Sequence, residues 1–487
     1  MIETISNILN ATWLYYVLMV LYFVSVVSII GVVLSENRNP VKSLAWVSVL
    51  VLLPVVGIIL YIFFGRNIKN KHLISRRTRR KLRRRQPPHV MDLRRLGLTQ
   101  DSMLQIKLAH SLTGAPLRPD NSVEVFTNGR DKFDALIGDL EAATSSINLQ
   151  YYIFSDDSIG NKIADILMRK ARQGVKVRVI YDHVGSFGTS RRFFRRLREA
   201  GVECEPFFKV TFPQLATRIN WRNHRKICII DGLVGYLGGM NIADRYIDGG
   251  TFDAWRDTHV RVTGPVVASL QFSVAVDWNS MGRGLIEECA DYSDHHLAAA
   301  ENAIHGVSAQ LLTSGPTSQW SNVAYAFHKA IAGAKRRIFI QTPYFLPTEG
   351  LLKALQTAAL AHVDVRIMLP ARSDSRMLTH ASASYIAECL RAGIKIYLYQ
   401  PGMLHSKMIL IDDEISSIGS TNFDFRSFEH NFESNLFFYS RPMATHIEEV
   451  YRTDLGACRR ITPSDWARRP MHVKAAESMI RLLSPIL

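Results

Sequence analysis

The chain has 487 residues, 47% of them hydrophobic, and a mean hydropathy of +0.02. These values exclude a largely disordered chain and leave room for more than one folded domain. Five cysteines without CxxC spacing exclude a disulfide framework or a zinc site of that kind, and they fit a reduced cytoplasm. They are Cys204, Cys228, Cys289, Cys389 and Cys458.

Two long uncharged apolar runs lie near the N-terminus, from Trp13 to Leu34 and from Leu44 to Phe64. Each run meets the length of about 20 residues that a helix needs to cross a bilayer. A cleaved signal peptide is a poor alternative, because no basic region precedes the first run and a second run follows at once. The short connection between the runs predicts a hairpin of two transmembrane helices.

Most of the positive charge follows the second apolar run. Between Arg66 and Arg95 there are 13 Lys or Arg residues and one acidic residue, Asp92, whereas the whole chain carries +16. Basic residues beside a span favour the cytoplasmic side and anionic lipid headgroups. A nucleic-acid enzyme would spread this charge over a binding face, so we expect a membrane partner and no nucleic acid. Both termini and a large catalytic portion are then cytoplasmic, as in a multi-pass protein of a bacterial inner membrane.

The remaining residues contain a repeated order of strands and helices, which predicts an α/β fold with mixed sheets in two similar halves. The least patterned stretch, 282–306, contains the boundary between the halves and the His295–His296 pair, which we interpret as exposed loop rather than metal ligands. The expected parts are a membrane hairpin over 1–65, a basic cytoplasmic linker over 66–120, a first half over 121–285 and a second half over 286–487.

Each half contains the pattern His-x-Lys-x4-Asp, in HRKICIID and again in HSKMILID. Each copy is followed at the same offset by GGMN or GSTN. Because one match is plausible by chance and two with matched Gly and Asn are not, the repeat predicts two half-sites of one active site. The candidate catalytic residues are His224, Lys226, Asp231, His405, Lys407 and Asp412, with Asn241 and Asn422 as supporting residues.

The residue types favour chemistry at phosphorus. One histidine can attack as a neutral imidazole while a second, protonated, gives its proton to the leaving oxygen. Lysine ammonium groups and asparagine amides can hold a phosphodiester and its transition-state charge. Each motif reads as a strand, a tight turn and a second strand, so His and Lys share one face. The Asp at the turn is better suited to orient or cap than to react.

These motifs resemble the HxKxxxxDxxxxxxG(G/S)xN signature of the phospholipase D superfamily. The resemblance implies two motifs that meet at a pseudo-twofold axis, a phosphohistidine intermediate and no metal. It also implies an acidic residue in each half that holds a histidine ring, here Asp257 in WRDTHV and Glu433 in NFESNL. Gly239 in the first motif corresponds to Ser420 in the second, which suggests unequal roles for the two halves.

Nearly the whole chain is also similar to bacterial cardiolipin synthases, most clearly in RNPVKSLAWVSVLVLLPVVGIILYIFFG, WRDTHVRVTGP and TPYFLP. This implies transfer of a phosphatidyl group between two phosphatidylglycerol molecules, giving cardiolipin and glycerol. His224 would attack and His405 would act as acid and then base. No nucleotide or other cofactor is implied, and the sequence contains no GxxxxGK[ST] motif.

Several alternatives stay open from the residues. Water could be the acceptor, which would make the protein a membrane-tethered phospholipase D-type hydrolase, and the charge distribution disfavours a nuclease. A non-enzymatic membrane scaffold is disfavoured because both motifs are intact. The two histidines could exchange roles, and phosphatidylethanolamine could replace one phosphatidylglycerol. The sequence indicates neither an oligomeric state nor whether the apolar C-terminal segment SMIRLLSPIL docks on the membrane or on the core.

Overall fold

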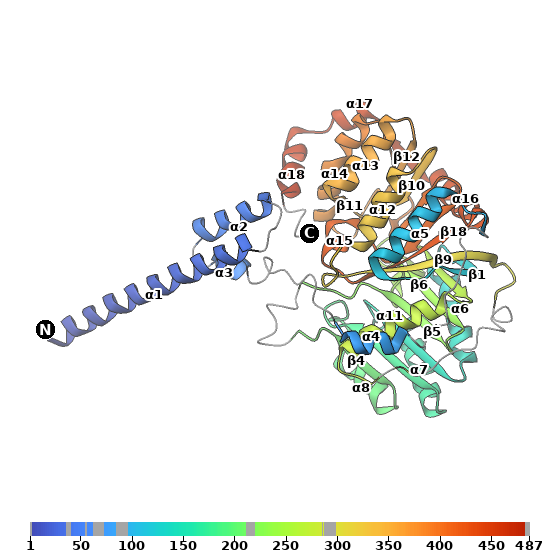
Figure 1. The fold of residues 1–487 in the computed structure, drawn as a ribbon, viewed down its shortest axis with the longest axis horizontal. Helices are drawn as coiled ribbons and strands as arrows, with labels where there is room; N and C mark the ends of the chain where they lie inside the picture. The colour runs from blue at the N-terminus through green and yellow to red at the C-terminus, as the bar shows by residue number, and fades with distance from the viewer. Residues whose placement is uncertain are drawn as a thin grey trace. The chain divides into compact units, whose positions relative to one another are not determined.

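The computed structural model describes residues 2–35, 40–53, 56–61, 73–83, 96–210, 220–284, 286 and 299–482 (Figure 1). The chain divides into two compact units, one of residues 1–68 with 210–220 and one of residues 69–209 with 221–487. The His295–His296 pair, Cys289 and the final residues 483–487 lie outside the described residues. Each unit is described by itself below.

The described helices of the first unit are α1 (Ile2–Ser35), α2 (Pro40–Leu52) and α3 (Val56–Leu60). The stretch Thr12–Gly31 of α1 is long and apolar enough to cross a membrane, and α2 contains a shorter apolar stretch, Ser43–Leu52. Helices α1 and α2 contact each other, and the Tyr22 hydroxyl donates to the carbonyl of Leu50 at 3.1 Å. The first apolar run therefore forms one helix, as predicted.

The second apolar run is not one uninterrupted helix in the described residues. Helix α2 ends at Leu52 and α3 begins at Val56, and Pro54 lies between them in the sequence. Proline has no amide hydrogen and its ring clashes with the carbonyl four residues earlier, which interrupts or kinks a helix. The amide of Leu53 donates to the carbonyl of Val49 at 3.0 Å and the amide of Gly57 donates to the carbonyl of Leu53 at 2.7 Å, so helical hydrogen bonds link the two segments.

The second unit contains one 15-stranded sheet with the order β19-β13-β12-β10-β15-β16-β18-β9-β1-β8-β6-β5-β2-β3-β4. Two helices precede it, α4 (Arg76–Arg83) and α5 (Gln100–Thr113). The elements of the first half are β1 (Arg118–Phe126), α6 (Gly129–Ala142), β2 (Ser146–Tyr151), α7 (Ser158–Arg172), β3 (Lys176–Asp182), α8 (Arg191–Glu199), β4 (Glu203–Phe207), β5 (Lys226–Ile230), β6 (Val234–Gly238), α10 (Arg245–Asp248), β7 (Trp255–Arg256), β8 (His259–Thr263) and α11 (Val267–Ser280).

The second half repeats this order. Its elements are β9 (Ile304–Ser314), α12 (Asn322–Ala332), β10 (Arg337–Gln341), β11 (Phe345–Leu346), α13 (Glu349–Leu360), β12 (Asp364–Pro370), α14 (Arg376–Arg391), β13 (Lys395–Tyr399), β14 (Met403–Leu404), β15 (Met408–Ile411), β16 (Ile415–Gly419), β17 (Phe423–Asp424), α15 (Phe425–Glu429), β18 (Glu433–Tyr439), α16 (Arg441–Gly456), β19 (Cys458–Ile461), α17 (Pro463–Ala467) and α18 (Met471–Arg481).

The sheet order is symmetric about the antiparallel pair β1–β9, with β19 as an extra edge strand. On one side of this pair the order is β8-β6-β5-β2-β3-β4, and on the other it is β18-β16-β15-β10-β12-β13. The outer three strands of each half are parallel and the inner ones antiparallel. The predicted mixed α/β fold with two halves is confirmed, and the halves share one continuous sheet.

Helices cover both faces of this sheet. One apolar core includes buried residues of α6, α7, α12 and α13, such as Leu136 and Leu355. The other includes buried residues of α11 and α16, such as Leu270 and Tyr451. Helix α5, within the segment we expected to be a linker, packs on α12 and β9, and its buried residues Ser102, Gln105, Ile106 and Ala109 lie on one helical face.

Candidate active site

Two short backbone pairings between the halves bring the motifs together. Strand β14, just before His405, pairs in parallel with β7, just before Asp257. The chain before His224 makes the matching bridge with Phe432, just before Glu433. The amide of His405 donates to the Arg256 carbonyl at 2.7 Å, and the amide of His224 donates to the Phe432 carbonyl at 2.9 Å. Each histidine therefore lies beside the acidic residue of the other half.

His224 forms a buried dyad with Glu433. Its Nδ1 lies 3.0 Å from Glu433 Oε1 and 3.1 Å from the Ser420 carbonyl oxygen. The Ser420 hydroxyl donates to Glu433 Oε2 at 2.5 Å, and the Asn431 amide donates to Oε1 at 3.2 Å. The neighbours of His224 Nδ1 are thus acceptors, which places the ring hydrogen on Nδ1 and leaves Nε2 as a free base.

His405 forms the second dyad with Asp257. Its Nδ1 lies 2.6 Å from Asp257 Oδ2, and the Thr258 amide donates to Oδ1 of the same carboxylate at 2.7 Å. The ammonium of Lys407 lies 2.7 Å from the same Nδ1 and 3.9 Å from Asp257 Oδ2. This ring nitrogen therefore contacts an anion and a cation, unlike its counterpart in His224.

The difference between Gly239 and Ser420 has a steric cause. A Cβ at Gly239 would lie 2.1 Å from Oδ1 of Asp257. The shorter Asp carboxylate occupies the space that a side chain would need, whereas Ser420 fits beside the longer Glu433 and donates to it. A donor hydroxyl is consequently present in one dyad and excluded from the other.

Burial and neighbouring charges set the protonation of the dyads. Burial is the largest cause that lowers the pKa of both histidines, and in His405 the charge of Lys407 adds to it. Burial alone would raise the pKa of both carboxyl groups. Lys407 and His405 nevertheless hold the pKa of Asp257 below its ordinary value, and His224 with Lys226 does so for Glu433. These shifts favour ionised carboxylates and neutral histidines.

The two motif lysines are buried, and each contacts the histidine of its own motif. Lys226 Nζ donates to the carbonyl of His224 at 2.6 Å, and Lys407 Nζ donates to the carbonyl of His405. Burial lowers the pKa of Lys226 well below its ordinary value and that of Lys407 to about 8. Each lysine thus contacts the backbone of its own histidine, as expected for residues two apart on a strand.

Asp231 and Asp412 lie at the far ends of their strands. Asp231 accepts from the amides of Thr144, Ser145 and Ser146 at 2.7–2.8 Å. Asp412 accepts from the amides of residues 335–337 at 2.8–3.0 Å. Both have positive φ, 53° and 51°, in the turns after β5 and β15. Five residue steps of strand, or ~16 Å, separate each Asp from its Lys. Both carboxylates therefore connect the turn to the backbone of a neighbouring segment and do not reach the reacting groups.

The two asparagines differ in their contacts. Asn241 accepts from the Ile153 amide at 3.1 Å and donates to the Tyr246 hydroxyl at 2.7 Å. Oδ1 of Asn422 has no hydrogen-bond partner among the residues that the structure describes. Both line the same cavity as the histidines. The Asn422 side chain also hydrogen-bonds the Asp424 carboxylate, so its available atom is the acceptor Oδ1.

A cavity of about 210 Å³ contains both histidines in its lining. Sequence reasoning missed its other polar members, because isolated Arg, Tyr and Asp residues usually indicate solvated surface. Arg222 lies two residues before His224, and Tyr152 packs edge-on against the His224 ring at 4.9 Å between centroids. The additional lining residues are Tyr152, Ile153, Arg222, Arg245, Tyr246, Trp255, Tyr344, Asp374, Leu378, Asp424, Arg426 and Asn431.

Charged side chains of both signs line this cavity. Arg222 and Arg426 accompany His224, and both interact with the neighbouring Tyr152. Asp374 accepts from the Tyr344 hydroxyl at 2.5 Å and acts electrostatically on His405. The arginines suit a phosphate, and the carboxylate of Asp374 suits a hydroxyl group. No cluster of three His, Cys, Asp or Glu side chains that could hold a metal occurs in the described part of the chain.

Two half-sites that meet on a symmetric α/β sheet, each with His-x-Lys and a buried carboxylate, define a phospholipase D-like protein. The family model described as "Cardiolipin synthase, PLD-like domain" matches residues 136–266 and 327–455, and one described as "Phospholipase_D-nuclease N-terminal" matches residues 20–66. The chain belongs to the cardiolipin synthase family of phospholipase D-like proteins.

Relatives in this family match over nearly their full length. The chain is 40% identical to the major cardiolipin synthase of Bacillus subtilis, covering 97% of this chain and 99% of that one. It is 38% identical to a cardiolipin synthase of Listeria monocytogenes, with the same coverage. A phosphatidylserine synthase structure from Haemophilus influenzae aligns over 79% of this chain and 100% of its own, with a TM-score of 0.60 and 12% identity. This last similarity concerns the fold alone.

Proposed function

We propose that the protein is a cardiolipin synthase, a phosphatidyltransferase that converts two phosphatidylglycerol molecules to cardiolipin and glycerol. The observation that carries this proposal is the pair of His–carboxylate dyads, each assembled across the halves, that line one cavity. Full-length similarity to proteins named cardiolipin synthases supports the choice of substrate.

In the first step, His224 Nε2 attacks the phosphorus of one phosphatidylglycerol. The ring hydrogen on Nδ1 faces Glu433, whose charge stabilises the developing imidazolium. The bond between phosphorus and the glycerol oxygen breaks, and His405 gives its proton to that oxygen. The lipid phosphate is then bonded to His224, and free glycerol leaves.

In the second step, the terminal hydroxyl of another phosphatidylglycerol attacks the phosphohistidine. His405, now neutral, removes the proton from this hydroxyl, and the phosphorus–nitrogen bond to His224 breaks. One phosphodiester is broken and one is made, so the cycle consumes no nucleotide and returns both histidines to their starting protonation. Lys226 and Lys407 lie close enough to act electrostatically on Glu433, and they offset the charge of the transferring phosphoryl group.

The choice of His224 as nucleophile is supported by the contacts of Nδ1. Only acceptors, the Glu433 carboxylate and the Ser420 carbonyl, contact His224 Nδ1 among the described residues, so its Nε2 is a base. His405 Nδ1 contacts the Lys407 ammonium as well as Asp257. Asp374, which acts on His405, can accept from the glycerol hydroxyls of the leaving group.

We also propose that α1 and the α2–α3 segment both cross the membrane. The basic segment after them favours the cytoplasm for both termini and for the catalytic unit. Accessibility of single cysteines introduced at Asn37, between the two runs, and at Lys474 would test this topology. Labelling of the first only from outside and of the second only from inside is expected in oriented membrane vesicles.

A product assay tests the function. Purified full-length protein in uncharged detergent is given labelled phosphatidylglycerol without metal or nucleotide, and the lipids are separated. Cardiolipin and glycerol in equal amounts are expected. Phosphatidic acid and glycerol without cardiolipin would overturn the proposal, because water would then be the acceptor and the protein a phospholipase D-type hydrolase.

A further inference from the structure

The catalytic cavity lies at the carboxyl ends of parallel strands in both halves. Tyr152 follows β2, Tyr344 follows β10 and Asp374 follows β12, and all three line the cavity. In α/β sheets, ligands commonly bind outside the carboxyl ends of the strands, where loops rather than helices form the surface. The loops at this edge therefore surround the place where a substrate enters.

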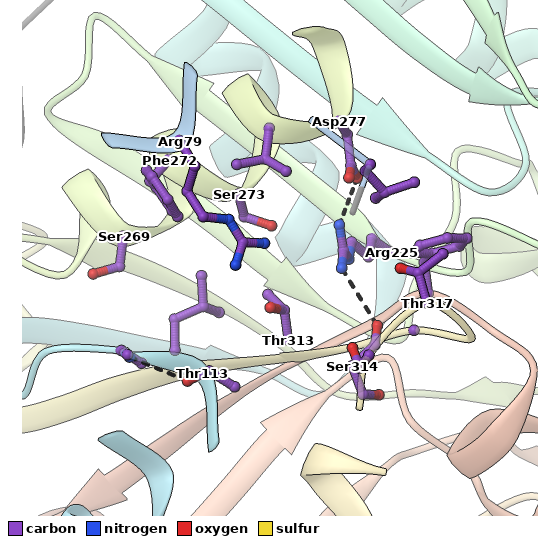
Figure 2. Close-up of a pocket in the computed structure, with 18 of the residues that line it drawn as sticks. Arg79, Thr113, Arg225, Ser269, Phe272, Ser273, Asp277, Thr313, Ser314 and Thr317 are labelled. Atoms are coloured by element: carbon purple, nitrogen blue, oxygen red, sulfur yellow. Dashed lines mark hydrogen bonds and ion pairs between the residues drawn. The ribbon is translucent and has the colours of Figure 1, made fainter. Parts of the chain in front are cut away.

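The opposite side of the first motif is occupied by an ion pair. Arg225, the residue after His224, borders a separate cavity of about 110 Å³ and pairs there with Asp277 at 2.5 Å (Figure 2). The two cavities share no lining residue. A lipid that reaches His224 therefore comes from the side of the loops.

The catalytic cavity has room for a headgroup but not for a whole lipid. Its volume is about 210 Å³. An acyl chain spans about 15 Å, which is half of the hydrocarbon core of a bilayer. The acyl chains of a phosphatidylglycerol therefore stay outside while its phosphate reaches His224, so an apolar medium must lie at the entrance of the cavity.

In the first half, the loop after β3 presents an exposed aromatic ring beside this entrance. Phe187 is 83% exposed, and Val184 of the same loop is 37% exposed. The Ser186 hydroxyl donates to the carbonyl of Tyr152 at 3.2 Å, and a Cβ at Gly185 would lie 2.6 Å from the Tyr152 ring. The loop is therefore held against a residue that lines the catalytic cavity.

The second half presents apolar side chains from the equivalent loop. The chain after β12 leads into α14, where Met377 is 46% exposed and Leu378 lines the cavity. The Tyr344 hydroxyl donates to Asp374 at 2.5 Å, which holds this loop beside the cavity. The apolar rim is the set of these side chains from both halves, namely Val184, Phe187, Met377 and Leu378.

Basic side chains accompany the apolar rim. Arg191 and Arg192 follow the first loop, Arg372 and Arg376 lie in or beside the second, and all four are exposed. The segments 183–192 and 371–378 contain one acidic residue, Asp374, and it lines the cavity. Exposed apolar side chains flanked by cations are the combination that binds an anionic membrane surface. The charge therefore favours a membrane as the occupant of the rim.

We propose that the apolar rim inserts into the membrane surface and seats the catalytic cavity against the bilayer. Lipid headgroups enter the cavity there, while their acyl chains stay in the hydrocarbon region. Phe187 and Met377, the most exposed members, contact the acyl chains, and the neighbouring arginines bind lipid phosphates. This contact is additional to the apolar N-terminal helices. It rests on the proposed function, because it describes how phosphatidylglycerol reaches His224.

Quenching by lipids with brominated acyl chains tests this contact without any turnover. Full-length His224→Ala protein is placed in liposomes of phosphatidylglycerol and phosphatidylcholine, with a fluorescent thiol label at Phe187→Cys, Met377→Cys or Leu360→Cys. The same protein without an introduced cysteine gives the background from the native thiols. Leu360 is the matched control, because it is 67% exposed and ends α13 before the amino end of β12, at the opposite edge of the sheet.

Brominated chains are expected to quench the label at Phe187→Cys and at Met377→Cys at least roughly twofold more than at Leu360→Cys, because a group in the interface lies about 5–10 Å deep. A smaller difference at either rim position would overturn the proposal. A blue shift of the label without such quenching would indicate a protein on the rim, such as a second copy of the chain, and would overturn it as well.

Cardiolipin formation by the otherwise unsubstituted protein gives a second readout. Phe187→Ser combined with Met377→Ser should lower the rate from phosphatidylglycerol in liposomes about tenfold, because two apolar side chains no longer enter the bilayer. Leu360→Ser should leave the rate unchanged. An unchanged rate in the double variant would overturn the role of the rim in substrate entry. If the unsubstituted protein forms no cardiolipin, the proposed function fails, and the quenching still decides whether the rim enters the bilayer.

Discussion

The two dyads have the same plan and different surroundings. His224 has Glu433, with the Ser420 hydroxyl and the Asn431 amide as further donors to that carboxylate. His405 has Asp257, which fits because Gly239 has no side chain, and the Lys407 ammonium lies beside the His405 ring. The duplicated motif therefore gives two different surroundings of Nδ1. In His224 this atom contacts acceptors alone, and in His405 it contacts a carboxylate and an ammonium group. This difference is the reason why we propose attack by His224 and proton transfer by His405.

The largest expected effect is loss of either histidine. His224→Ala and His405→Ala should each lower cardiolipin formation by about 10⁴-fold or more, since each removes a group that acts in both steps. A phosphatidyl ester with p-nitrophenol as leaving group separates their roles, because this leaving group needs no protonation. His405→Ala should keep a stoichiometric burst of p-nitrophenol, and His224→Ala should give none. The reverse pattern would exchange the two roles.

The crossed pairing of histidines and carboxylates gives the second prediction. Glu433→Gln and Asp257→Asn should each lower cardiolipin formation by about 10²–10⁴-fold. With the p-nitrophenyl ester, Glu433→Gln should slow the burst, whereas Asp257→Asn should leave it almost unchanged. If each carboxylate served the histidine of its own half, the two variants would behave the other way round.

Gly239 and Ser420 allow a finer comparison of the same dyads. Gly239→Ala places a methyl group where Asp257 Oδ1 lies, so cardiolipin formation should fall about 100-fold while the p-nitrophenol burst is retained. Ser420→Ala removes one hydrogen bond to Glu433 and should cost about tenfold in both assays. Equal effects of the two substitutions would show that the steric difference between the halves has no functional weight.

The turn aspartates test which motif residues are structural. Asp231→Ala removes the acceptor of three strand-connecting amides, and Asp412→Ala does the same in the other half. Each should lower the free energy of unfolding by about 2 kcal/mol, seen as a lower Tm in detergent. The kcat of the protein that remains folded should change less than about threefold. A large loss of kcat at unchanged Tm would give these residues a catalytic role.

Much of this arrangement is predictable from the sequence, because it depends on local patterns. Apolar β-branched runs predicted the strands around both motifs, and the recurrence of His, Lys and Asn predicted one shared site. Asp257 and Glu433 were expected to hold histidine rings, and both contact one. The family resemblance, which the comparisons confirm, supplied those two positions rather than any local pattern.

Other features depend on contacts between distant segments. Each histidine meets the carboxylate of the other half because β7 pairs with β14 and Asn223 with Phe432. The sequence of either segment alone does not indicate this pairing. The cavity arginines are single charged residues, Arg222 before β5 and Arg245 and Arg426 in the short helices α10 and α15, and such residues usually indicate solvent exposure. The second apolar run is described as α2 and α3, on either side of residues 54 and 55, and its crossing of the membrane stays a prediction.

The pH dependence of the reaction also distinguishes the two dyads. Burial lowers the pKa of both histidines, so His224 stays neutral and nucleophilic to below pH 6.5. For His405 the same direction reduces the protonated fraction at neutral pH, and the acid form is needed in the first step. The ratio kcat/KM for cardiolipin formation should therefore fall as pH rises from 6 to 8, approaching tenfold per unit. With the p-nitrophenyl ester, which needs no acid, the burst rate should be nearly constant over this range. A parallel fall in both assays would place the titrating group elsewhere than His405.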